Sequence, residues 1–429
     1  MATEGTLPGL AARPSFDTRV AEAGFVLVLW LIIVGLTPFD TRTAAAIAAR
    51  DAASAQGDML RQVTFVGTFA MILYGALRQH GIAAFRAVPA LIALLLVWCF
   101  ATALWTDEPD VVARRAVLAA IFVLSMLFAV DTLGTARTVA LWRATIAFVI
   151  VADIASCLVI HNAVHQPNDL EANLAGAWRG LHSHKNMAGS VAASAVAMFF
   201  YFWLDSRKRW DLVLCVASLF FLAMTRSKSS MGLLPVAMAA GLLYRIAARN
   251  MLDRSIAAVG AVLLVLAFGV VVALEWQVIA SFLEDPQHFT GRAAIWSAET
   301  AFIRDHPLIG SGFGTFGNTG VRSPIYQYVG AGWVSQIGEG HSGYLEMLVT
   351  LGGIGFAIGM AGLIVQPFVQ FWRAGRGSNL DALLFTLFVF DVLHNFMESD
   401  FVQVTSAQWG QMLMVIALLR TSLRESRPA

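Results

Sequence analysis

The chain alternates long apolar runs with short polar connections over most of its length. A helix that crosses the hydrocarbon core of a bilayer needs about 20 mainly apolar residues, and many runs in this chain approach or reach that length. The pattern predicts twelve spans, at residues 22–39, 62–78, 87–105, 116–133, 138–160, 187–204, 211–225, 231–247, 256–275, 343–370, 381–397 and 402–419. We therefore expect an all-α polytopic membrane protein, in which residues 1–429 form a single integral membrane domain.

Composition supports this interpretation. Hydrophobic residues make up 58% of the chain and charged residues 13%, and the mean hydropathy is +0.69. A soluble domain carries about 25% charged residues, so a soluble fold is excluded. The formal net charge of +1 gives no reason to expect a nucleic-acid partner.

The distribution of basic residues predicts the orientation of the spans. Twelve spans place both ends of the chain on one side of the membrane, and the short connections on that side are rich in arginine, which is typical of the cytoplasm. The opposite side would hold 12 of the 29 basic residues: Arg42, Arg50, Arg61, Arg114, Arg115, Arg179, Lys185, Arg226, Lys228, Arg292, Arg304 and Arg322. Most of these could be ordinary solvated loop charges, but a cluster around one site would indicate an anion.

One outward segment, residues 276–342 between the ninth and tenth spans, is much longer than the others. Loops of this length are uncommon unless they are functional or disordered, and this one is too aromatic for disorder. Thr290 is a suitable cap for a helix, on which Arg292, Trp296 and Glu299 share one face. We expect an active-site loop that carries short helices.

A glycine-rich turn and a histidine complete this loop. The turn, 307–314, has glycines that permit close approach to a ligand, which is weak evidence for phosphate binding. His341 stands directly before an apolar helix and can accept a proton near neutral pH. Arg292, together with Arg226 and Lys228 from a short outward turn, could neutralise a diphosphate leaving group.

Four histidines in the outward segment 161–186 allow a different interpretation, as metal ligands. They are His161, His165, His182 and His184. No cysteine joins them, and no glutamate completes an HExxH pattern. We expect a histidine-rich polar loop, with neither a metal nor a cofactor.

Polar groups also interrupt the apolar runs, at Asp153, Asp391, His394 and Glu398. Such groups are usually functional or paired. Glu398 lies near the outer end of the eleventh predicted span, on the side of the long loop, and is therefore a candidate substrate-binding residue. Asp391 is deeper and would also suit a proton relay.

Several motifs together resemble the O-antigen ligase and polysaccharide polymerase superfamily of bacterial inner membranes. They are Gly291-Arg292 with Trp296, the segment from His306 to Phe316, His341 to Leu345, the turn Ser227-Lys228-Ser229, and a His-Lys-Asn-x-x-Gly box within Gly180 to Gly189. The last of these is similar to a box of exopolysaccharide polymerases. The motifs cover roughly residues 180–400.

The resemblance implies a metal-independent glycosyltransferase on the periplasmic face of the inner membrane, acting on a glycan linked to undecaprenyl diphosphate. His341 would be the general base, and Arg292 and Lys228, with Arg226, would hold the diphosphate. Many members have arginine where Lys228 stands. The remaining candidate substrate-binding residues are Arg179, His184, Lys185, Asn186 and Glu398.

Among the activities of this superfamily, the box favours polymerisation of repeat units of an exopolysaccharide or O-antigen. An O-antigen ligase, which transfers glycan to lipid A core, is the first alternative. A transporter or flippase of lipid-linked sugars would explain twelve spans and buried acids, but not the long loop. A structural subunit of an export complex explains none of the polar residues. Export and chain-length proteins are possible partners.

Overall fold

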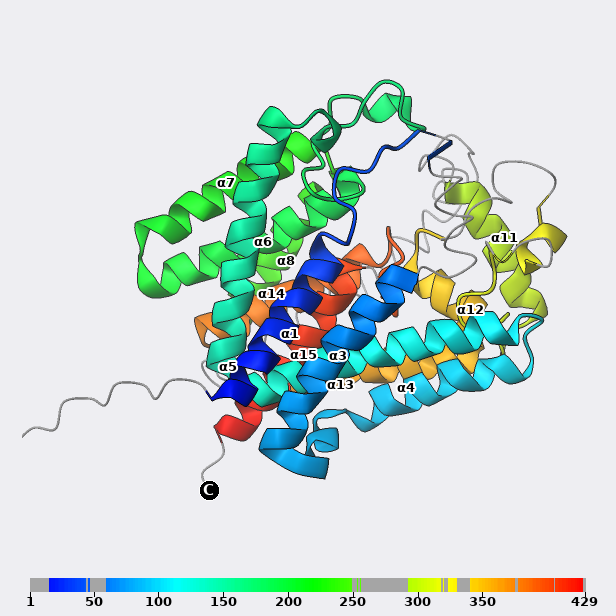
Figure 1. The fold of residues 1–429 in the computed structure, drawn as a ribbon, viewed down its shortest axis with the longest axis horizontal. Coiled ribbons are helices and arrows are strands. Elements are labelled where there is room, and N and C mark those ends of the chain that lie inside the picture. The colour runs from blue at the N-terminus through cyan, green and yellow to red at the C-terminus, as the bar shows by residue number, and fades with distance from the viewer. Residues whose placement is uncertain are drawn as a thin grey trace, which may run out of the picture.

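The computed structural model describes most of the chain, namely residues 15–43, 45–46, 59–248, 253, 255, 292–317, 319, 323–329, 340–374, 377–404 and 406–426. Within these residues the fold is built of helices, and a single antiparallel bridge, between Val164 and Trp178, is the only β-type pairing. The chain is therefore an all-α protein over its described part, as the hydrophobic pattern predicts (Figure 1).

The main helices lie on predicted spans, except α11, which lies within the predicted loop 276–342. They are α1 (Phe16–Ile33), α3 (Met59–His80), α4 (Ala90–Ala101), α5 (Pro109–Val159), α6 (Lys185–Ser206), α7 (Arg209–Thr225), α8 (Lys228–Ala247), α11 (Arg292–Asp305), α12 (Gly343–Met360), α13 (Gln366–Ala374), α14 (Asn379–His394) and α15 (Ala407–Glu425). Short 3₁₀ or π turns separate some of them: η1 (Gly81–Ala87), η2 (Thr102–Leu104), η3 (His161–Ala163), η4 (Ala172–Leu174), η6 (Pro324–Gln327) and η8 (Ala361–Val365).

Five helical stretches of the described chain are long and apolar enough to cross a membrane by length and composition: Met59–Ala87, Pro109–Val159, Lys185–Ser206, Lys228–Ala247 and Gly343–Ala374. The protein is thus a membrane protein with several apolar helices. The count of twelve spans stays a prediction, and the predicted span 256–275 lies outside the described residues. The extent of the predicted loop 276–342 and the single-domain organisation also stay predictions.

Two kinked helices account for differences from the predicted ranges. The fourth and fifth predicted spans form one helix, α5, that bends at Gly134, where φ is +71°. Glycine adopts this left-handed conformation at little cost. The tenth predicted span, α12 and its continuation through η8 and α13, is interrupted at Gly352, where φ is +70°.

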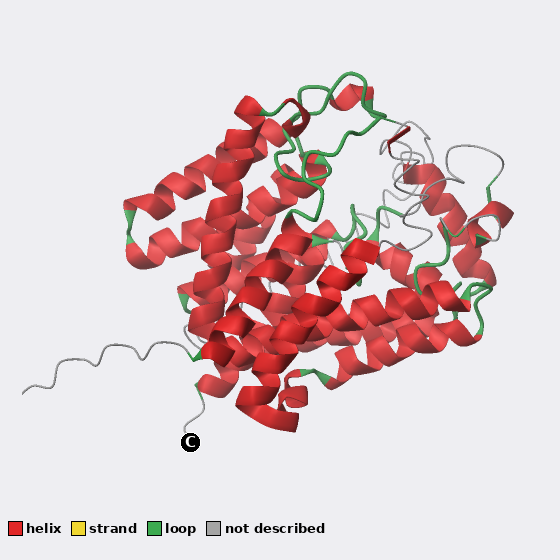
Figure 2. Cartoon of the chain, in the orientation of Figure 1, coloured by secondary structure: helices red, strands yellow, loops and turns green. Residues whose placement is uncertain are grey.

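The core lies where α1, α3, α5 and α15 pack together, with α6 beside them (Figure 1). Helices α6, α7, α8 and α14 form a second group on one side of this core, and α4, the first half of α5 and α12 run together on the other. Long loops gather at one end of the assembly, above α1 and α6 in Figure 2. This end carries the candidate site.

Candidate functional site

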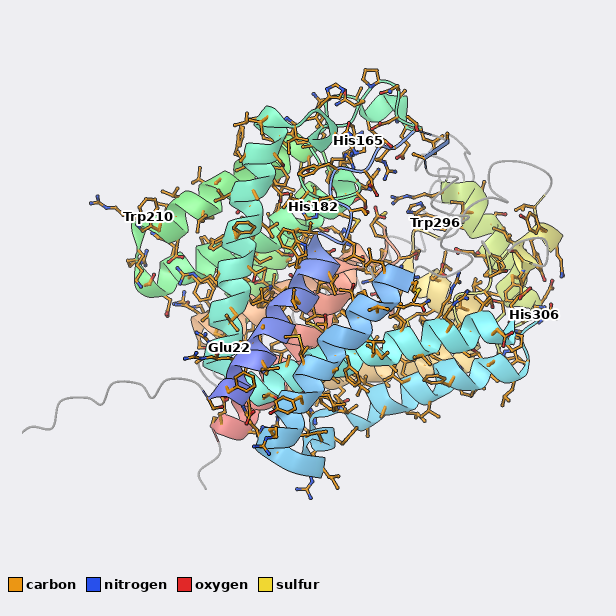
Figure 3. All side chains as sticks on the ribbon, viewed as in Figure 1. Glu22, His165, His182, Trp210, Trp296 and His306 are labelled. Carbon is orange, nitrogen blue, oxygen red and sulfur yellow. The ribbon has the colours of Figure 1, made fainter. Side chains whose placement is uncertain are left out.

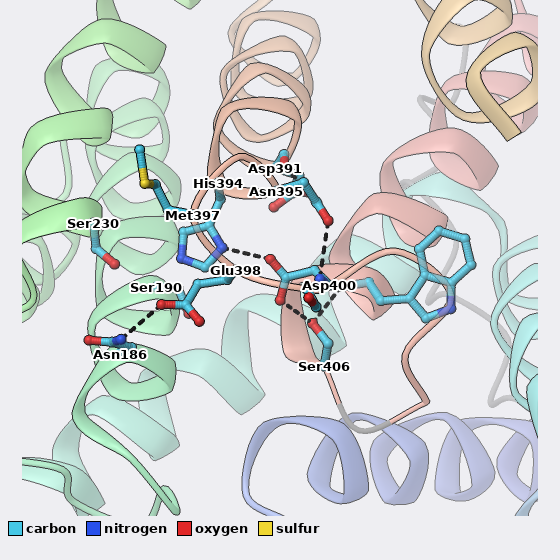
Figure 4. Close-up of polar contacts among 12 residues, drawn as sticks. Asn186, Ser190, Ser230, Asp391, His394, Asn395, Met397, Glu398, Asp400 and Ser406 are labelled. Atoms are coloured by element: carbon cyan, nitrogen blue, oxygen red, sulfur yellow. Dashed lines mark hydrogen bonds and ion pairs between the residues drawn. The ribbon is translucent and has the colours of Figure 1, made fainter. Parts of the chain in front are cut away.

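Glu398, in the connection between α14 and α15, joins three elements that are far apart in the sequence. Its Oε1 accepts hydrogen bonds from Asn186 Nδ2 at 2.8 Å and from Arg292 Nη2 at 2.9 Å. Its Oε2 lies 3.3 Å from Nδ1 of His341. Figure 4 shows the bond from Asn186 at the start of α6. Three of the predicted site residues therefore meet at the carboxylate of a fourth, Glu398.

The environment of Glu398 keeps it ionised. Burial by itself would raise the pKa of this carboxyl, but the hydrogen bond with His341 and the positive charge of Arg292 outweigh burial and lower the pKa to about 2. Arg292 also donates from Nη1 to the carbonyl of Met397, so it holds both the side chain and the backbone of this connection. A fixed negative charge therefore lies beside the imidazole of His341.

His341 is held in an unusual backbone conformation just before α12. Its φ is +52°, a region that residues with a Cβ rarely adopt. The next two residues fix it: the amide of Ser342 donates to Ser399 Oγ, and the amide of Gly343 donates to the carbonyls of Asn395 and Glu398. These bonds tie the start of α12 to the connection that carries Glu398.

The pairing with Glu398 determines which ring nitrogen of His341 can act as a base. An ionised carboxylate only accepts hydrogen bonds, so Nδ1 must carry the proton. The lone pair then lies on Nε2, which has no hydrogen-bond partner among the residues that the structure describes. The side chain is 37% exposed. This carboxylate–imidazole arrangement is the one by which hydrolases orient a general base.

The connection between α14 and α15 owes its shape to its own polar side chains. Asn395 accepts from the amides of Asp400 and Phe401, and Asp400 in turn bonds to His394 Nδ1 at 2.6 Å and to Ser406 Oγ at 2.7 Å (Figure 4). Polar groups buried at such depth are usually hydrogen-bonded. Here they fix the turn that presents Glu398.

The His-Lys-Asn-x-x-Gly box forms the start of α6. His184 caps the helix, because its Nδ1 accepts from the amide of Asn186, and its Nε2 bonds to Glu171 at 3.2 Å. The hydrogen bond from His184 is the main reason that the pKa of Glu171 is lowered to about 2. Lys185 Nζ donates to the carbonyl of Arg226 at 3.1 Å. The box therefore contacts the short turn between α7 and α8.

The glycine of this box explains why the two motifs occur together. A methyl group at Gly189 would overlap the side chain of Ser227 and lie 3.2 Å from Ser230 Oγ. The two serines bond to each other at 3.1 Å and are buried. A small residue at 189 thus lets α6 approach the turn that carries Arg226 and Lys228.

Three cations lie close together here, and none of them is bonded to a carboxylate among the residues that the structure describes. Arg226 makes one long bond, 3.5 Å, to the carbonyl of Ala175, and Lys185 makes the bond to Arg226. Lys228 has no hydrogen bond or ion pair within the described part of the chain, and it interacts electrostatically with Lys185. Lys185 and Lys228 are each the first residue of a helix, where the helix dipole disfavours a cation. Such an arrangement suits a bound anion.

At the opposite end of the molecule, two arginines form ion pairs with acidic side chains. There Arg137 binds Glu22 through two bonds of 2.6 and 2.8 Å, and Arg78 lies 3.4 Å from Asp17. Glu22 lies at the lower left of Figure 3, at the far end of α1 from the loops. Arg78 and Arg137 on that side have acidic partners, whereas Arg226 on the site's side has none among the described residues.

Arg179 lies apart from these cations. Its side chain is buried, and its guanidinium donates to the carbonyls of His182 and Ser183, both at 3.3 Å, and of Asp40 at 2.5 Å. Three backbone acceptors occupy the face that a substrate would need. The structure gives Arg179 a scaffolding position, and we do not include it in the site.

Three histidines of the segment 161–186 are likewise bonded within the protein. His165 contacts Asp169 at 3.1 Å and the amide of Lys185 at 3.3 Å, and burial lowers its pKa to about 4. His182 contacts Asp153 at 3.2 Å and the carbonyl of Ile33 at 2.8 Å. Within the described residues, no group of three or more His, Cys, Asp or Glu side chains is placed to hold a metal ion.

The glycine-rich turn contacts α12, and at its end the carbonyl of Gly314 accepts a hydrogen bond from Arg115 of α5. The amides of Ser311 and Gly312 donate to the carbonyls of Val349 and Thr350, and the amides of Gly353 and Ile354 donate to those of Pro307 and Leu308, at 2.9–3.2 Å. In these bonds, the turn pairs with the backbone carbonyls and amides of α12 that the break at Gly352 leaves without a helical partner. The turn is therefore a structural partner of α12, and the idea that its glycines bind phosphate has no support in this geometry.

Sequence reasoning found the residues at Glu398 but missed the carboxylate of Glu171 and the partner of Glu299. Glu171 bonds to His184 and, at 3.2 Å, to Arg42. Glu299 faces Glu346 in the first turn of α12. The only available signal for the second contact was the position of Glu299 on the same helical face as Arg292 and Trp296.

Comparison with known proteins supports the resemblance. A search of the curated proteins finds no match to this chain. Residues 213–360, about one third of the chain, match the family model described as O-antigen ligase. This range includes Arg226, Lys228, Arg292 and His341. Over residues 213–360 the chain is thus similar to the O-antigen ligase family, in agreement with the resemblance of its motifs.

Proposed function

We propose that the protein is a glycosyltransferase that polymerises oligosaccharide repeat units carried on undecaprenyl diphosphate, at the periplasmic face of the inner membrane. The observation that carries the proposal is the meeting of Asn186, Arg292 and His341, with its open ring nitrogen, at Glu398. Lys185, the neighbour of Asn186, bonds to the turn that carries the cations Arg226 and Lys228. All of these groups lie at helix ends or in connections between helices.

His341 acts as the general base in this proposal. Its Nε2 takes the proton from the acceptor hydroxyl, and the hydroxyl oxygen forms a bond to the anomeric carbon of the donor sugar. Glu398, ionised at neutral pH, stabilises the imidazolium that forms. The bond between the anomeric carbon and the phosphate oxygen breaks, and its electron pair leaves with undecaprenyl diphosphate.

The cations stabilise this leaving group. Lys228 and Arg226, which have no acidic partner among the described residues, bind the phosphate oxygens at the ends of α7 and α8. Arg292 has five N–H donors and gives two of them to Glu398 and Met397. Its remaining donors face the diphosphate. A diphosphate is a good leaving group, so no second carboxylate is needed as an acid.

Two alternatives remain for the test to separate. An O-antigen ligase would use the same base and cations with a lipid A core acceptor. A transporter would have its polar groups near the middle of the membrane, whereas the groups named above lie at helix termini.

The test uses purified protein in detergent with an undecaprenyl-diphosphate oligosaccharide as the sole substrate, without added metal and with a chelator in a parallel sample. A ladder of longer lipid-linked glycans is expected from the wild type and not from His341→Ala. Transfer only after lipid A core is added would make the protein a ligase. No product with either acceptor, from protein shown to be folded, would overturn the proposal.

A further inference from the structure

Gly340, the residue before His341, is held from three directions. Its carbonyl accepts a hydrogen bond from Trp296 Nε1 at 2.9 Å, and its amide donates to Glu346 Oε2 at 3.1 Å. On the third side, the carboxyl of Glu299 lies so close that a methyl group at position 340 would overlap it. A side chain at position 340 would displace the carboxyl of Glu299, and the two hydrogen bonds restrain the backbone of Gly340.

Two of these contacts come from one face of α11. Arg292, Trp296 and Glu299 are spaced four and three residues apart, so they follow one another along the helix. Arg292 holds Glu398, Trp296 holds the carbonyl of Gly340, and Glu299 packs against its Cα. A single helix therefore fixes both the carboxylate that orients His341 and the backbone from which His341 projects.

The surroundings of Glu299 favour the neutral form of its carboxyl group. Its side chain is 1% exposed, and its Oε2 has no hydrogen-bond partner within the described residues. Burial first, and the charge of Glu346 second, raise its pKa well above the usual value. An ionised Glu299 would place two carboxylates against each other, with Arg115 of α5 as the further charge that interacts with Glu346.

We infer that Trp296 and Glu299 are positioning residues for His341, and that Glu299 acts in its protonated form by filling the space beside Gly340. The inference rests on the proposed role of His341 as the base. His341 has a φ of +52°, which costs a residue with a Cβ conformational energy. The contacts at Gly340 hold the backbone in this state and direct Nε2 toward the acceptor.

Three variants test the inference through kcat, KM and pH. Glu299→Gln keeps the shape and the neutral charge, so kcat at neutral pH should equal that of the wild type. Glu299→Ala leaves space beside Gly340, and its kcat should fall about 10- to 100-fold with KM unchanged. Trp296→Phe removes one hydrogen bond to Gly340 and should lower kcat about tenfold. Trp210→Phe, on the outer edge of the molecule in Figure 3, is the matched control.

The pH profile separates positioning from mere stability. In the wild type, ionisation of Glu299 adds a charge beside Glu346, so kcat should fall as pH rises through the raised pKa. Glu299→Gln cannot ionise, and its kcat should stay level over the same range. An identical fall with rising pH in wild type and Glu299→Gln would overturn the role of the protonated carboxyl.

A second readout does not depend on activity. Diethyl pyrocarbonate modifies neutral, accessible imidazole nitrogens, and mass spectrometry gives the rate at His341 relative to the exposed His306 at the far end of α11 (Figure 3). Glu299→Ala should change this ratio and Glu299→Gln should restore it. An unchanged ratio in Glu299→Ala would overturn the positioning role. A changed ratio together with full activity of His341→Ala would instead refute the proposed function and leave the positioning intact.

Discussion

Two regions of this protein combine histidines with carboxylates, and they differ in how completely their ring nitrogens are used. Between residues 165 and 184, His165, His182 and His184 each bond through both nitrogens to protein groups. His341 bonds through Nδ1 alone among the described residues, and 37% of its side chain is exposed. A histidine without a spare lone pair holds structure together, and one with a spare lone pair is available for chemistry.

The largest effect is expected at His341. His341→Ala removes the base, and kcat should fall about 100- to 10,000-fold, while the thermal midpoint in detergent stays near that of the wild type because the side chain is partly exposed. Transfer from the lipid-linked donor, assayed by product gel, measures the rate. A kcat close to that of the wild type would remove His341 from the mechanism.

The matched change in the other region should act on stability instead. His182→Ala breaks a fully buried contact with Asp153 and should destabilise the protein by about 3 kcal/mol. The thermal midpoint should drop clearly, while kcat per folded molecule stays near the wild-type value. A large loss of kcat in folded His182→Ala would show that the two regions do not divide structure and chemistry in this way.

Arg292→Lys should have the next largest effect. Lysine keeps the charge but cannot bind Glu398 and the Met397 carbonyl at once with a planar fork. We expect kcat/KM to fall about 10- to 100-fold. Arg304→Lys, an exposed change on the same helix, should have no effect. Equal activity of the two variants would show that Arg292 contributes only its positive charge and not its two-point contact with Glu398 and Met397.

Lys228→Gln tests the anion site with a smaller expected change. Removing one cation that has no described partner should raise KM for the lipid-linked donor about tenfold, and leave the thermal midpoint unchanged or slightly higher. Lys208→Gln, at the start of α7 on the other side of the molecule, is the control. A KM that responds equally to both changes would indicate a general attraction to charge rather than a site.

The smallest effect concerns acid stability. The pKa of Glu398 is about 2 in the folded protein and 4.5 for the free side chain, so its contribution to stability is present above about pH 4.5 and is lost as pH falls toward 2. The thermal midpoint of the wild type should therefore fall by a few degrees more between about pH 5 and pH 3 than that of Glu398→Gln. Parallel curves would show that the Glu398 contacts contribute little to stability.

Much of the helical fold and of the candidate site could be predicted from the sequence, because apolar periodicity and charge are local properties of the chain. The described helices lie on eleven of the twelve predicted ranges, and the residues that meet at Glu398 were all candidates. The exception among the cations is Arg179. In the sequence it lies in a segment predicted to face the outer side of the membrane, but in the fold its guanidinium binds three backbone carbonyls. Nothing in a linear pattern distinguishes a guanidinium facing backbone from one facing solvent.

Contacts between segments that are far apart along the chain likewise could not be predicted from the sequence. The glycines at 310–314 suggested a ligand, yet their conformation serves a pairing with α12 some forty residues later. The carboxylates of Glu299 and Glu346 are separated by 47 positions (346 − 299), and their meeting depends on how α11 docks on α12. Such contacts arise from tertiary packing, which overrides local propensity.

The break in α12 has a consequence for how this protein is made. A helix interrupted among apolar residues exposes backbone amides and carbonyls, which lipid cannot satisfy. Here the segment 307–312 supplies the missing partners through four hydrogen bonds. The backbone groups at the break therefore gain their partners only after the segment 307–312, which is translated earlier, has folded against them. Lengthening the chain between residues 312 and 340 should be tolerated far better than any change within 307–312, where the register of four bonds would be lost.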